Sequence, residues 1–247
     1  MGKKKKKIFL PQLPADTSII DTHCHLDMIA DGEALGEAVT RAAAAGVRAI
    51  ITVGIDLESS KKAIQLAESF ASVYATVGIH PHNTRGLTDN SYAELEKLCR
   101  KPKVVAYGEI GLDYVKQYAP KEVQLEHFDR QVILAKQTGL PLVVHDREAH
   151  ADILNVLRDK APFPAGGVMH CFSGDWQFAL KILELGFMVS IPGVVTFNKA
   201  AAMQDVAQRV PLDKLILETD APFLAPEPLR GKKNFPEYIL YTARKVA

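Results

Sequence analysis

Eight short apolar runs alternate with segments of helical character, and this alternation most constrains the fold of the chain. The runs are rich in Val and Ile, as is typical of parallel strands that are covered on both faces. We expect strands at residues 18–21, 47–53, 73–78, 104–109, 141–145, 167–170, 187–191 and 214–220. The expected helices cover residues 33–45, 58–70, 92–100, 121–138, 148–160, 175–185 and 198–209, and a last helix opens at Pro236. Eight such repeats predict an α/β fold that closes into a (β/α)8 TIM barrel.

The length of the chain agrees with one barrel. The 247 residues fall near the roughly 200–250 residues that such a domain uses. No glycine-rich phosphate fingerprint follows the first expected strand, which argues against an open doubly wound sheet. We therefore expect an N-terminal basic tail at residues 1–16 and a single barrel domain at residues 17–247.

The charge of the chain is concentrated at its N-terminus. The formal net charge is +1, but residues 3–7 are all lysine. Without them, 25 basic residues face 29 acidic ones, so the remaining body carries a net charge of −4. This body lacks the broad basic field of a dedicated nucleic-acid binder, and an anionic substrate would need a local site. The lysine run itself predicts a solvated tail, with weak attraction to nucleic acid as the alternative.

Cysteine usage and hydropathy indicate the compartment. Cys24, Cys99 and Cys171 are odd in number and far apart, which favours a reducing, cytoplasmic environment over a disulfide framework. No apolar run reaches the roughly 18 residues that a membrane span needs, so we expect no membrane partner. No obligate protein partner is evident.

Acidic residues and histidines recur where the expected strands end. His23 and His25 are two residues apart, so on a strand they face the same side, which suits a shared divalent ion. The residues at strand ends are His23, His25, His80, His82, Glu109, His145, His170 and Asp220. In a (β/α)8 barrel these positions converge on one mouth. A single histidine at a strand end is usually structural, but six at one rim predict a metal site.

The residue types suggest how metals would be shared. The candidate ligands form two groups that Glu109 could bridge: His23, His25 and Asp220 for one ion, and His145 and His170 for a second. A carboxylate can bridge two cations about 3.5–4 Å apart. Mixed imidazole and carboxylate ligands suit Zn, Mn, Fe or Ni and tolerate Mg, so we expect one or two divalent ions per chain. Asp220 could also accept the proton of an attacking water.

Six segments carry a resemblance to a known family. They are D-T-H-C-H-L-D (21–27), G-I-H-P-H (78–82), G-E-I-G-L-D (108–113), V-V-H-D-R-E-A (143–149), H-C-F-S-G (170–174) and E-T-D-A-P-F-L-A-P (218–226). In this order they resemble the TatD family of metal-dependent deoxyribonucleases, within the amidohydrolase-like barrels. The resemblance runs from about residue 18 to residue 240. It implies a TIM barrel, a one- or two-metal centre and cleavage of DNA, often from the 3′ end of single strands.

The resemblance also assigns residues. It implies that the metal ligands are His23, His25, Glu109, His145, His170 and Asp220, with Glu109 and Asp220 as the catalytic carboxylates. It implies that His80 and His82 lie near the substrate phosphate. The family pattern further leads us to expect that the last helix continues past Ala247.

Basic side chains offer further substrate contacts. Residues 229–236 resemble the family segment after the last strand, where Arg230 could bind a phosphate bidentately and Lys232 as a point charge. The alternative is a solvated basic loop. Arg147 is another phosphate candidate, unless it pairs with Glu148 or another neighbour.

Asp113 and three aromatic residues each have two interpretations. Asp113 could orient a ligand histidine, or it could be an ordinary loop cap. Trp176, Phe172 and Phe223 could stack bases, but packing in the core or a loop explains each of them better.

Three function classes remain. The sequence favours a nuclease that cleaves phosphodiester bonds in DNA with a metal-activated water. The second class is a hydrolase of the same fold that acts on a small amide, ester, lactone or phosphotriester, including aminoacyl esters. The third is a non-catalytic nucleic-acid or partner-binding protein with a structural metal.

Overall fold

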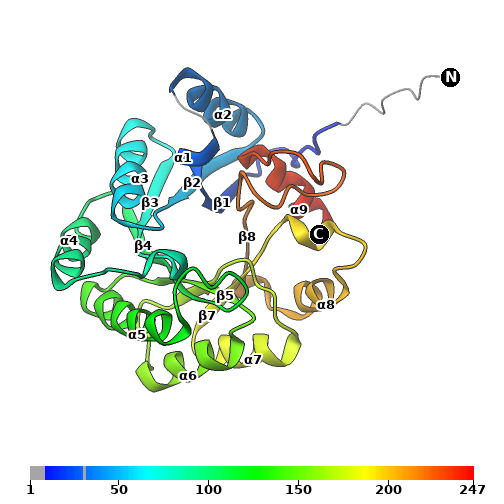
Figure 1. Ribbon diagram of the computed structural model, residues 1–247. Helices are drawn as coiled ribbons and strands as arrows, with labels where there is room; N and C mark the ends of the chain where they lie inside the picture. The colour runs from blue at the N-terminus through cyan, green and yellow to red at the C-terminus, as the bar shows by residue number, and fades with distance from the viewer. Residues whose placement is uncertain (1–8, 30–31) are drawn as a thin grey trace.

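The computed structural model describes residues 9–29 and 32–247, and in these ranges eight parallel strands lie side by side in chain order (Figure 1). The strands are β1 (Ile19–Cys24), β2 (Val47–Val53), β3 (Val73–Val77), β4 (Val104–Asp113), β5 (Leu142–Arg147), β6 (Gly167–Met169), β7 (Phe187–Ile191) and β8 (Leu215–Leu217). The ring closes between its first and last strands, where Cys24 pairs with Ala221 in a parallel bridge. The expected (β/α)8 barrel is confirmed, whereas the lysine run at 3–7 lies outside the described residues.

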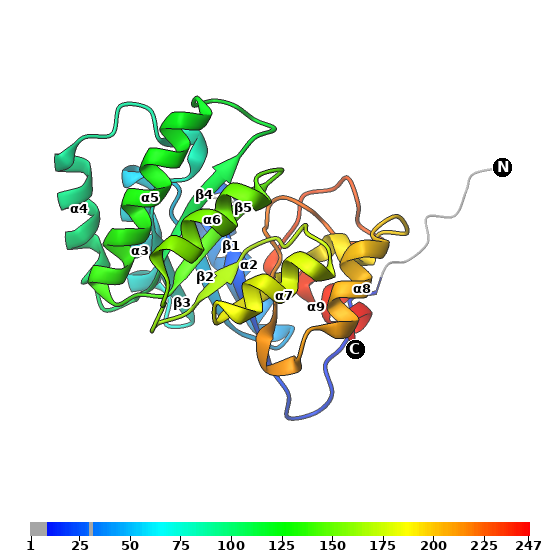
Figure 2. The same ribbon diagram turned by 90° about the horizontal axis from the view of Figure 1, so that it is seen from below.

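The helices pack outside the strands (Figures 1 and 2). They are α1 (Leu26–Ile29), α2 (Gly32–Ala44), α3 (Leu57–Ser69), α4 (Asp89–Cys99), α5 (Lys121–Thr138), α6 (His150–Lys160), α7 (Trp176–Glu184), α8 (Ala201–Arg209) and α9 (Ile239–Val246). Short 3-10 turns lie at η1 (Pro81–Asn83), η2 (Gly193–Thr196), η3 (Leu212–Lys214) and η4 (Pro236–Tyr238). Asp175 caps α7 by accepting a hydrogen bond from the Phe178 N–H at 2.9 Å. Gly139 ends α5 with a left-handed φ of 72°.

The strands that carry the chemistry differ from their expected bounds. Strand β4 is longer than predicted, because it stays paired with β5 as far as Asp113. A Cβ on Gly111 would lie 1.9 Å from the carbonyl oxygen of His145, so only glycine permits this close pairing. Strand β8 is shorter than predicted, because Asp220 adopts a left-handed φ of 56° that an extended strand does not allow.

The core fills the barrel interior and the layer between strands and helices. Tyr107 on β4, Phe128 on α5 and Phe187 on β7 are fully buried. Burying a side chain of this size contributes about 1.5–3 kcal/mol. Contacts of this kind hold the strand ends in fixed positions, which the mouth of the barrel needs.

The N-terminal segment and the last helix meet on one side of the barrel (Figure 2). The hydroxyl of Tyr241 on α9 donates to the carbonyl of Phe9 at 3.0 Å. Cys24, Cys99 and Cys171 are all free thiols, in agreement with the predicted absence of disulfides. Within residues 9–29 and 32–247, no helix combines the length and apolar character required to cross a membrane.

Candidate metal centre

The carboxylate of Glu109 lies at the centre of the barrel mouth. It is carried by β4 and is only 3% exposed. In the described part of the chain, five histidine nitrogens lie within 4 Å of it. Oε2 is 3.4 Å from His23 and 3.9 Å from His25, and Oε1 is 3.5 Å from His80, 2.7 Å from His145 and 3.7 Å from His170. Its two oxygens therefore face two sets of imidazoles.

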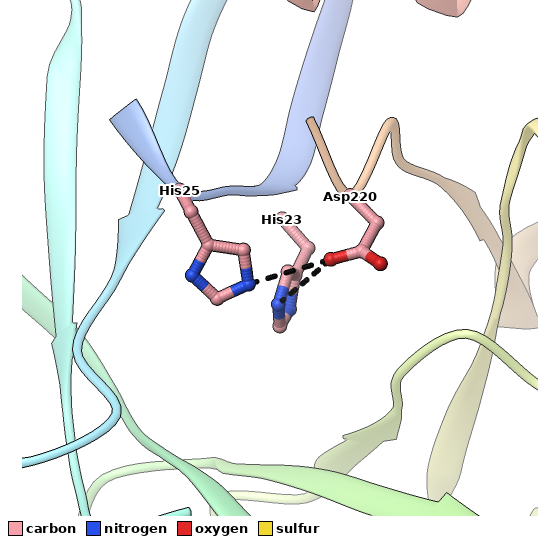
Figure 3. Close-up of side chains that lie close together, drawn as sticks. All are labelled: His23, His25 and Asp220. Atoms are coloured by element: carbon pink, nitrogen blue, oxygen red, sulfur yellow. Dashed lines mark ion pairs between the residues drawn. The ribbon is translucent and has the colours of Figure 1, made fainter. Parts of the chain in front are cut away.

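The loop after β8 adds a second carboxylate to this centre. Oδ1 of Asp220 lies 3.4 Å from Nε2 of His25 and 3.8 Å from Nε2 of His23 (Figure 3). The backbone N–H of Asp220 donates to the carbonyl of His23 at 2.9 Å. This bond fixes the distance between the last strand end and the first, and so holds the carboxylate against the two histidines.

The charges at the mouth are strongly coupled. Burial alone would raise the pKa of Glu109, but the charge of His170 and the hydrogen bond from His145 outweigh it and hold that pKa well below its usual range. Burial would likewise lower the pKa values of the histidines. Asp113 and Glu109 instead raise the pKa of His145 to about 9, and Glu218 and Glu109 raise that of His170 to about 10. The carboxylates are thus ionised at neutral pH, and protons on neighbouring imidazoles balance them.

The donor set fits a divalent metal. Both ring nitrogens of His23, Nδ1 of His25 and Nε2 of His145 are buried without a hydrogen-bond partner among the described residues. Buried polar atoms are otherwise almost always paired. Metal-sized groups of donors are His23, His25 and Asp220; His23, Glu109 and His170; His80, Glu109 and His145; and His170, Cys171 and Glu218. All six sequence-predicted metal ligands belong to the first three of these groups.

His170 is oriented as a ligand by a residue that the sequence argument did not select. Its Nδ1 lies 3.0 Å from Oε2 of Glu218, which leaves Nε2 directed toward Glu109. A carboxylate on the far ring nitrogen of a histidine fixes its tautomer and increases its basicity toward a metal. Oε1 of Glu218 accepts from the Cys171 N–H at 2.7 Å, and Oε2 accepts from Ser190 at 2.6 Å. Glu218 is therefore fully engaged as a support for this histidine.

Cys171 does not complete a sulfur site. Burial raises the pKa of its thiol well above the usual value, and the nearby carboxylate of Glu218 adds to this effect. A protonated thiol is a poor metal ligand. Cys171 is therefore not counted among the proposed ligands.

His80 has the opposite orientation to His170. Its Nδ1 accepts a hydrogen bond from the His82 N–H at 3.1 Å. Burial, reinforced by repulsion from His145, lowers the pKa of His80 well below its ordinary value, so the ring is neutral. A neutral ring that accepts at Nδ1 carries its proton on Nε2. That nitrogen faces Glu109 as a donor, which suits hydrogen bonding to an anion better than metal ligation.

His82 and Asp113 form the outer edge of the cluster. Nε2 of His82 lies 2.8 Å from Oδ2 of Asp113, and the same oxygen lies 3.5 Å from Nε2 of His145. Asp113 also accepts from the backbone N–H groups of Val115 and Lys116. Asp113 therefore caps its loop and also contacts two histidines, and that it orients a ligand histidine stays a prediction.

The basic candidates lie farther from the centre. Arg147 is half exposed and its Nη1 lies 3.9 Å from Oδ2 of Asp113, a loose ion pair with a neighbour. The guanidinium of Arg230 lies 4.5 Å from the ring centre of Phe197. Lys232 is exposed. In the described part of the chain, neither Arg230 nor Lys232 contacts Glu109 or Asp220, so their predicted phosphate contacts remain predictions.

Two buried acids were missed from the sequence, although spacing could have found them. Glu218 is two residues before Asp220, and Asp21 is two residues before His23, so period-two alternation places each beside a candidate ligand. Asp21 accepts from the Thr219 N–H at 2.9 Å and from its hydroxyl at 2.6 Å. These bonds connect β1 to the segment after β8, directly beneath the candidate ligands.

A separate hollow lies at the other end of the barrel. It has a volume of about 310 Å³ and lies between the end of α5 and the starts of β5 and β6, where Lys136, Leu142 and Phe163 line it. It contains no histidine or acid. The chemistry therefore belongs to the mouth and not to this hollow.

The fold and the mouth together define the class of the protein. It is a parallel (β/α)8 barrel with the imidazole and carboxylate donors of a divalent metal centre where the carboxyl ends of its strands meet. The profile of the TatD related DNase family matches residues 20–247, so the chain belongs to this family.

Individual relatives cover most of the chain. A Bacillus subtilis protein named uncharacterized metal-dependent hydrolase YabD is 38% identical over 93% of this chain and 90% of its own length. An Edwardsiella piscicida protein named 3'-5' ssDNA/RNA exonuclease TatD is 35% identical over 85% of this chain and 84% of its own. The crystal structure of YjjV, a TatD homologue from Escherichia coli, superposes with a TM-score of 0.87 at 35% identity, covering 92% of this chain and 88% of that one.

Proposed function

We propose that the chain is a metal-dependent nuclease that hydrolyses phosphodiester bonds in nucleic acid, with DNA as the expected substrate. The observation that carries the proposal is the position of Glu109, whose two carboxylate oxygens each face a separate set of histidines within 4 Å. A bridging carboxylate of this kind suits two ions that clamp one phosphate. The family match and the printed name of the Edwardsiella piscicida relative support nucleic acid as the substrate class.

The proposed ligands are the six residues predicted from the sequence: His23, His25, Glu109, His145, His170 and Asp220. A divalent ion held by them would act as a Lewis acid and lower the pKa of a bound water. The candidate metals are Mg, Mn, Zn, Fe and Ni, because several of these accept mixed imidazole and carboxylate donors.

Asp220 is the proposed proton acceptor. Burial alone would raise its pKa, but the hydrogen bond from His25 and the charge of His170 lower it, so the carboxylate is ionised at neutral pH. Its Oδ1 faces His25 and His23. An ionised carboxylate in this position can take a proton from an attacking water.

His80 and the basic residues are the proposed substrate contacts. The Nε2–H of His80 can donate to a phosphate oxygen, because Nδ1 is already an acceptor. His82 is held at the edge of the cluster by Asp113. Arg147, Arg230 and Lys232 would supply positive charge around the mouth, which a body with more acids than bases otherwise lacks.

A conservative substitution tests the proposal. Asp220 has a left-handed backbone that asparagine tolerates, so Asp220→Asn removes the charge and preserves the fold. We expect the metal-loaded wild-type chain to release nucleotides from single-stranded DNA, and a chelator to abolish the release. We expect Asp220→Asn to lower kcat by about 10²–10⁴-fold, the usual contribution of a positioned general base. Unchanged turnover in Asp220→Asn would contradict its assigned role.

The near-neutral body supports a second candidate, a small-molecule hydrolase of the same fold. An acidic surface gives little attraction to long nucleic acid. Turnover of an ester, lactone or amide, with no turnover of DNA or RNA under any of the five metals, would favour this candidate. Salt-dependent DNA binding without turnover of any substrate would instead favour a binding protein.

A further inference from the structure

Exposed apolar side chains gather around the mouth of the barrel. In the described part of the chain, the large exposed hydrophobic residues are Phe9, Leu10, Met28, Val115, Tyr118, Ile133, Leu212 and Phe223. Half of these follow the carboxyl end of a strand: Met28 after β1, Val115 and Tyr118 after β4, and Phe223 after β8. Exposed apolar surface beside a polar cluster is typical of a ligand site.

The aromatic members of this rim contact the histidines of the centre. Tyr118 is 59% exposed, and its ring centre lies 4.8 Å from that of His82 at an interplanar angle of 84°. Phe223 is 51% exposed, and its ring centre lies 5.9 Å from that of His25 at 70°. Each ring therefore touches the cluster with part of its surface and leaves the rest open to solvent.

The two rings come from opposite sides of the mouth. The strands follow one another in chain order around the ring, so the loops after β4 and β8 are four strands apart and face each other (Figure 1). Tyr118 adjoins the part of the cluster that contains His82 and Asp113, and Phe223 adjoins the part that contains His25 and Asp220. A bond held at Glu109 would have one aromatic ring on either side.

Packing accounts for only part of each ring. Phe172, in the loop after β6, is 2% exposed and stacks on Phe178 at 5.7 Å, so a rim aromatic in this fold can be buried. Phe223 packs against His25 with part of its ring, and half of its surface remains open. A flat apolar face beside a site for an anionic group matches a nucleobase attached to a phosphodiester. Base stacking on an aromatic side chain strengthens binding by about fivefold to a hundredfold per base.

We propose that Tyr118 and Phe223 are stacking platforms for the two nucleobases that flank the phosphodiester to be cut, and that these two rings make the site prefer an unpaired strand. This inference rests on the proposed nuclease function. In a duplex, the bases stack on one another and their faces are closed to side chains. Stacking requires no particular base, so the platforms select unpaired strands without selecting a sequence.

Kinetics with the metal-loaded full chain test the platforms. The substrate is a single-stranded oligothymidylate, and the variants are Tyr118→Leu, Phe223→Leu and Tyr118→Trp. We expect each leucine variant to raise KM about tenfold with metal content unchanged by elemental analysis, and Tyr118→Trp to preserve KM. Phe9→Leu is the control, because Phe9 is 73% exposed and precedes β1, away from the mouth. It should leave KM unchanged.

Modified substrates identify which base each ring contacts. 5,6-Dihydrothymidine keeps the size of thymidine but has a non-planar ring that stacks poorly. Placed on one side of the cut bond, it should raise KM for the wild type and have no further effect in the matching leucine variant. The stacking proposal would be overturned if KM were unchanged in both leucine variants. It would also be overturned if dihydrothymidine raised KM equally in the wild type and the variants.

A failure of the nuclease proposal can be distinguished from a failure of the stacking proposal. If the wild type cleaves no nucleic acid with any metal, the binding of a labelled oligothymidylate to the metal-loaded chain is measured by fluorescence anisotropy. This measurement tests whether the two rings stack on bases. Binding that weakens about tenfold in Tyr118→Leu would support stacking without catalysis, and absence of binding would overturn it.

Discussion

At the scale of single residues, the ring nitrogen that is already occupied decides what a histidine can do. His170 has its Nδ1 against Glu218 and presents Nε2 to the centre, whereas His80 accepts at Nδ1 and presents an N–H. Both lie at metal distance from Glu109. Distance alone would make both of them ligands. The contact at Nδ1 of each ring makes His170 a proposed metal ligand and His80 a proposed donor to the substrate.

Matched glutamine variants test this separation. We expect His170→Gln to weaken metal binding by about a hundredfold or more, since loss of even a supporting contact costs 10–100-fold. We expect His80→Gln to bind metal as the wild type does, and to raise KM for the oligonucleotide about tenfold, the value of one hydrogen bond to a charged group. Metal titration with a competing chelator, together with steady-state kinetics, gives both values. Equal loss of metal in the two variants would make His80 a ligand.

At the scale of elements, irregular pairing positions the candidate ligands. The register of β1 against β2 shifts between Asp21 and Cys24, a segment that contains His23. The register of β4 against β5 shifts between Tyr107 and Ile110, a segment that contains Glu109. Irregularities of this type redirect side chains and are frequent beside active sites. The sequence predicted the strands, but these local shifts aim their side chains at a common point.

Helix α5 supports the mouth through two buried glutamines, Gln124 and Gln131, which are seven residues apart and so lie on one face. The side chain of Gln131 accepts from the Ile79 N–H at 2.8 Å and donates to the Ile79 carbonyl at 2.9 Å. Gln124 makes the same pair of contacts with the backbone of Asp113. The segments that carry His80 and Asp113 are thus fixed by the same helix.

The substitution Gln131→Leu tests this support. It removes both partners of the buried backbone groups of Ile79, so we expect the free energy of unfolding to fall by about 2–4 kcal/mol. Gln65→Leu, at an exposed position of α3, should change it by less than about 0.5 kcal/mol. Chemical denaturation measures both. A loss in Gln131→Leu no greater than that in Gln65→Leu would show that the contacts do not stabilise the loop.

At the scale of the whole molecule, the centre couples metal, protons and stability. Burial favours the neutral form of a histidine and lowers its pKa. Asp113 and Glu109 nevertheless raise the pKa of His145 to about 9, and Glu218 and Glu109 raise that of His170 to about 10. Raised pKa values mean that these protons stabilise the metal-free chain fully below pH 6.5. This contribution is lost as the pH rises through 9 and 10. Metal ligation needs the same nitrogens unprotonated, so protons and metal compete.

Thermal unfolding measures this competition. A metal at a hundred times its Kd should stabilise the folded chain by about 2.7 kcal/mol, which is about 5–10 °C in Tm for a chain of this length. At a fixed concentration of Mn²⁺, we expect the rise in Tm to be larger at pH 8.5 than at pH 6.5. The rise should be smaller in Asp220→Asn at both values. A rise independent of pH would contradict the competition between metal and protons.

The sequence by itself determined the barrel fold and which histidines and carboxylates lie at its mouth. Apolar runs of strand length, separated by helical segments, can bury their surfaces only in a few ways, so the fold follows from their number and order. The carboxyl ends of parallel strands share one edge, so His23, Glu109 and Asp220 could be placed together without coordinates.

Only the tertiary structure decided the roles within that mouth. The tautomer of His170 depends on Glu218, which is 48 positions away in sequence. The exposure of Phe223 and the positions of Arg230 and Lys232 depend on how a loop without regular structure lies over the barrel. Periodicity reports which side of an element a residue occupies, but hydrogen bonds and burial are set by neighbours that the fold brings from elsewhere in the chain.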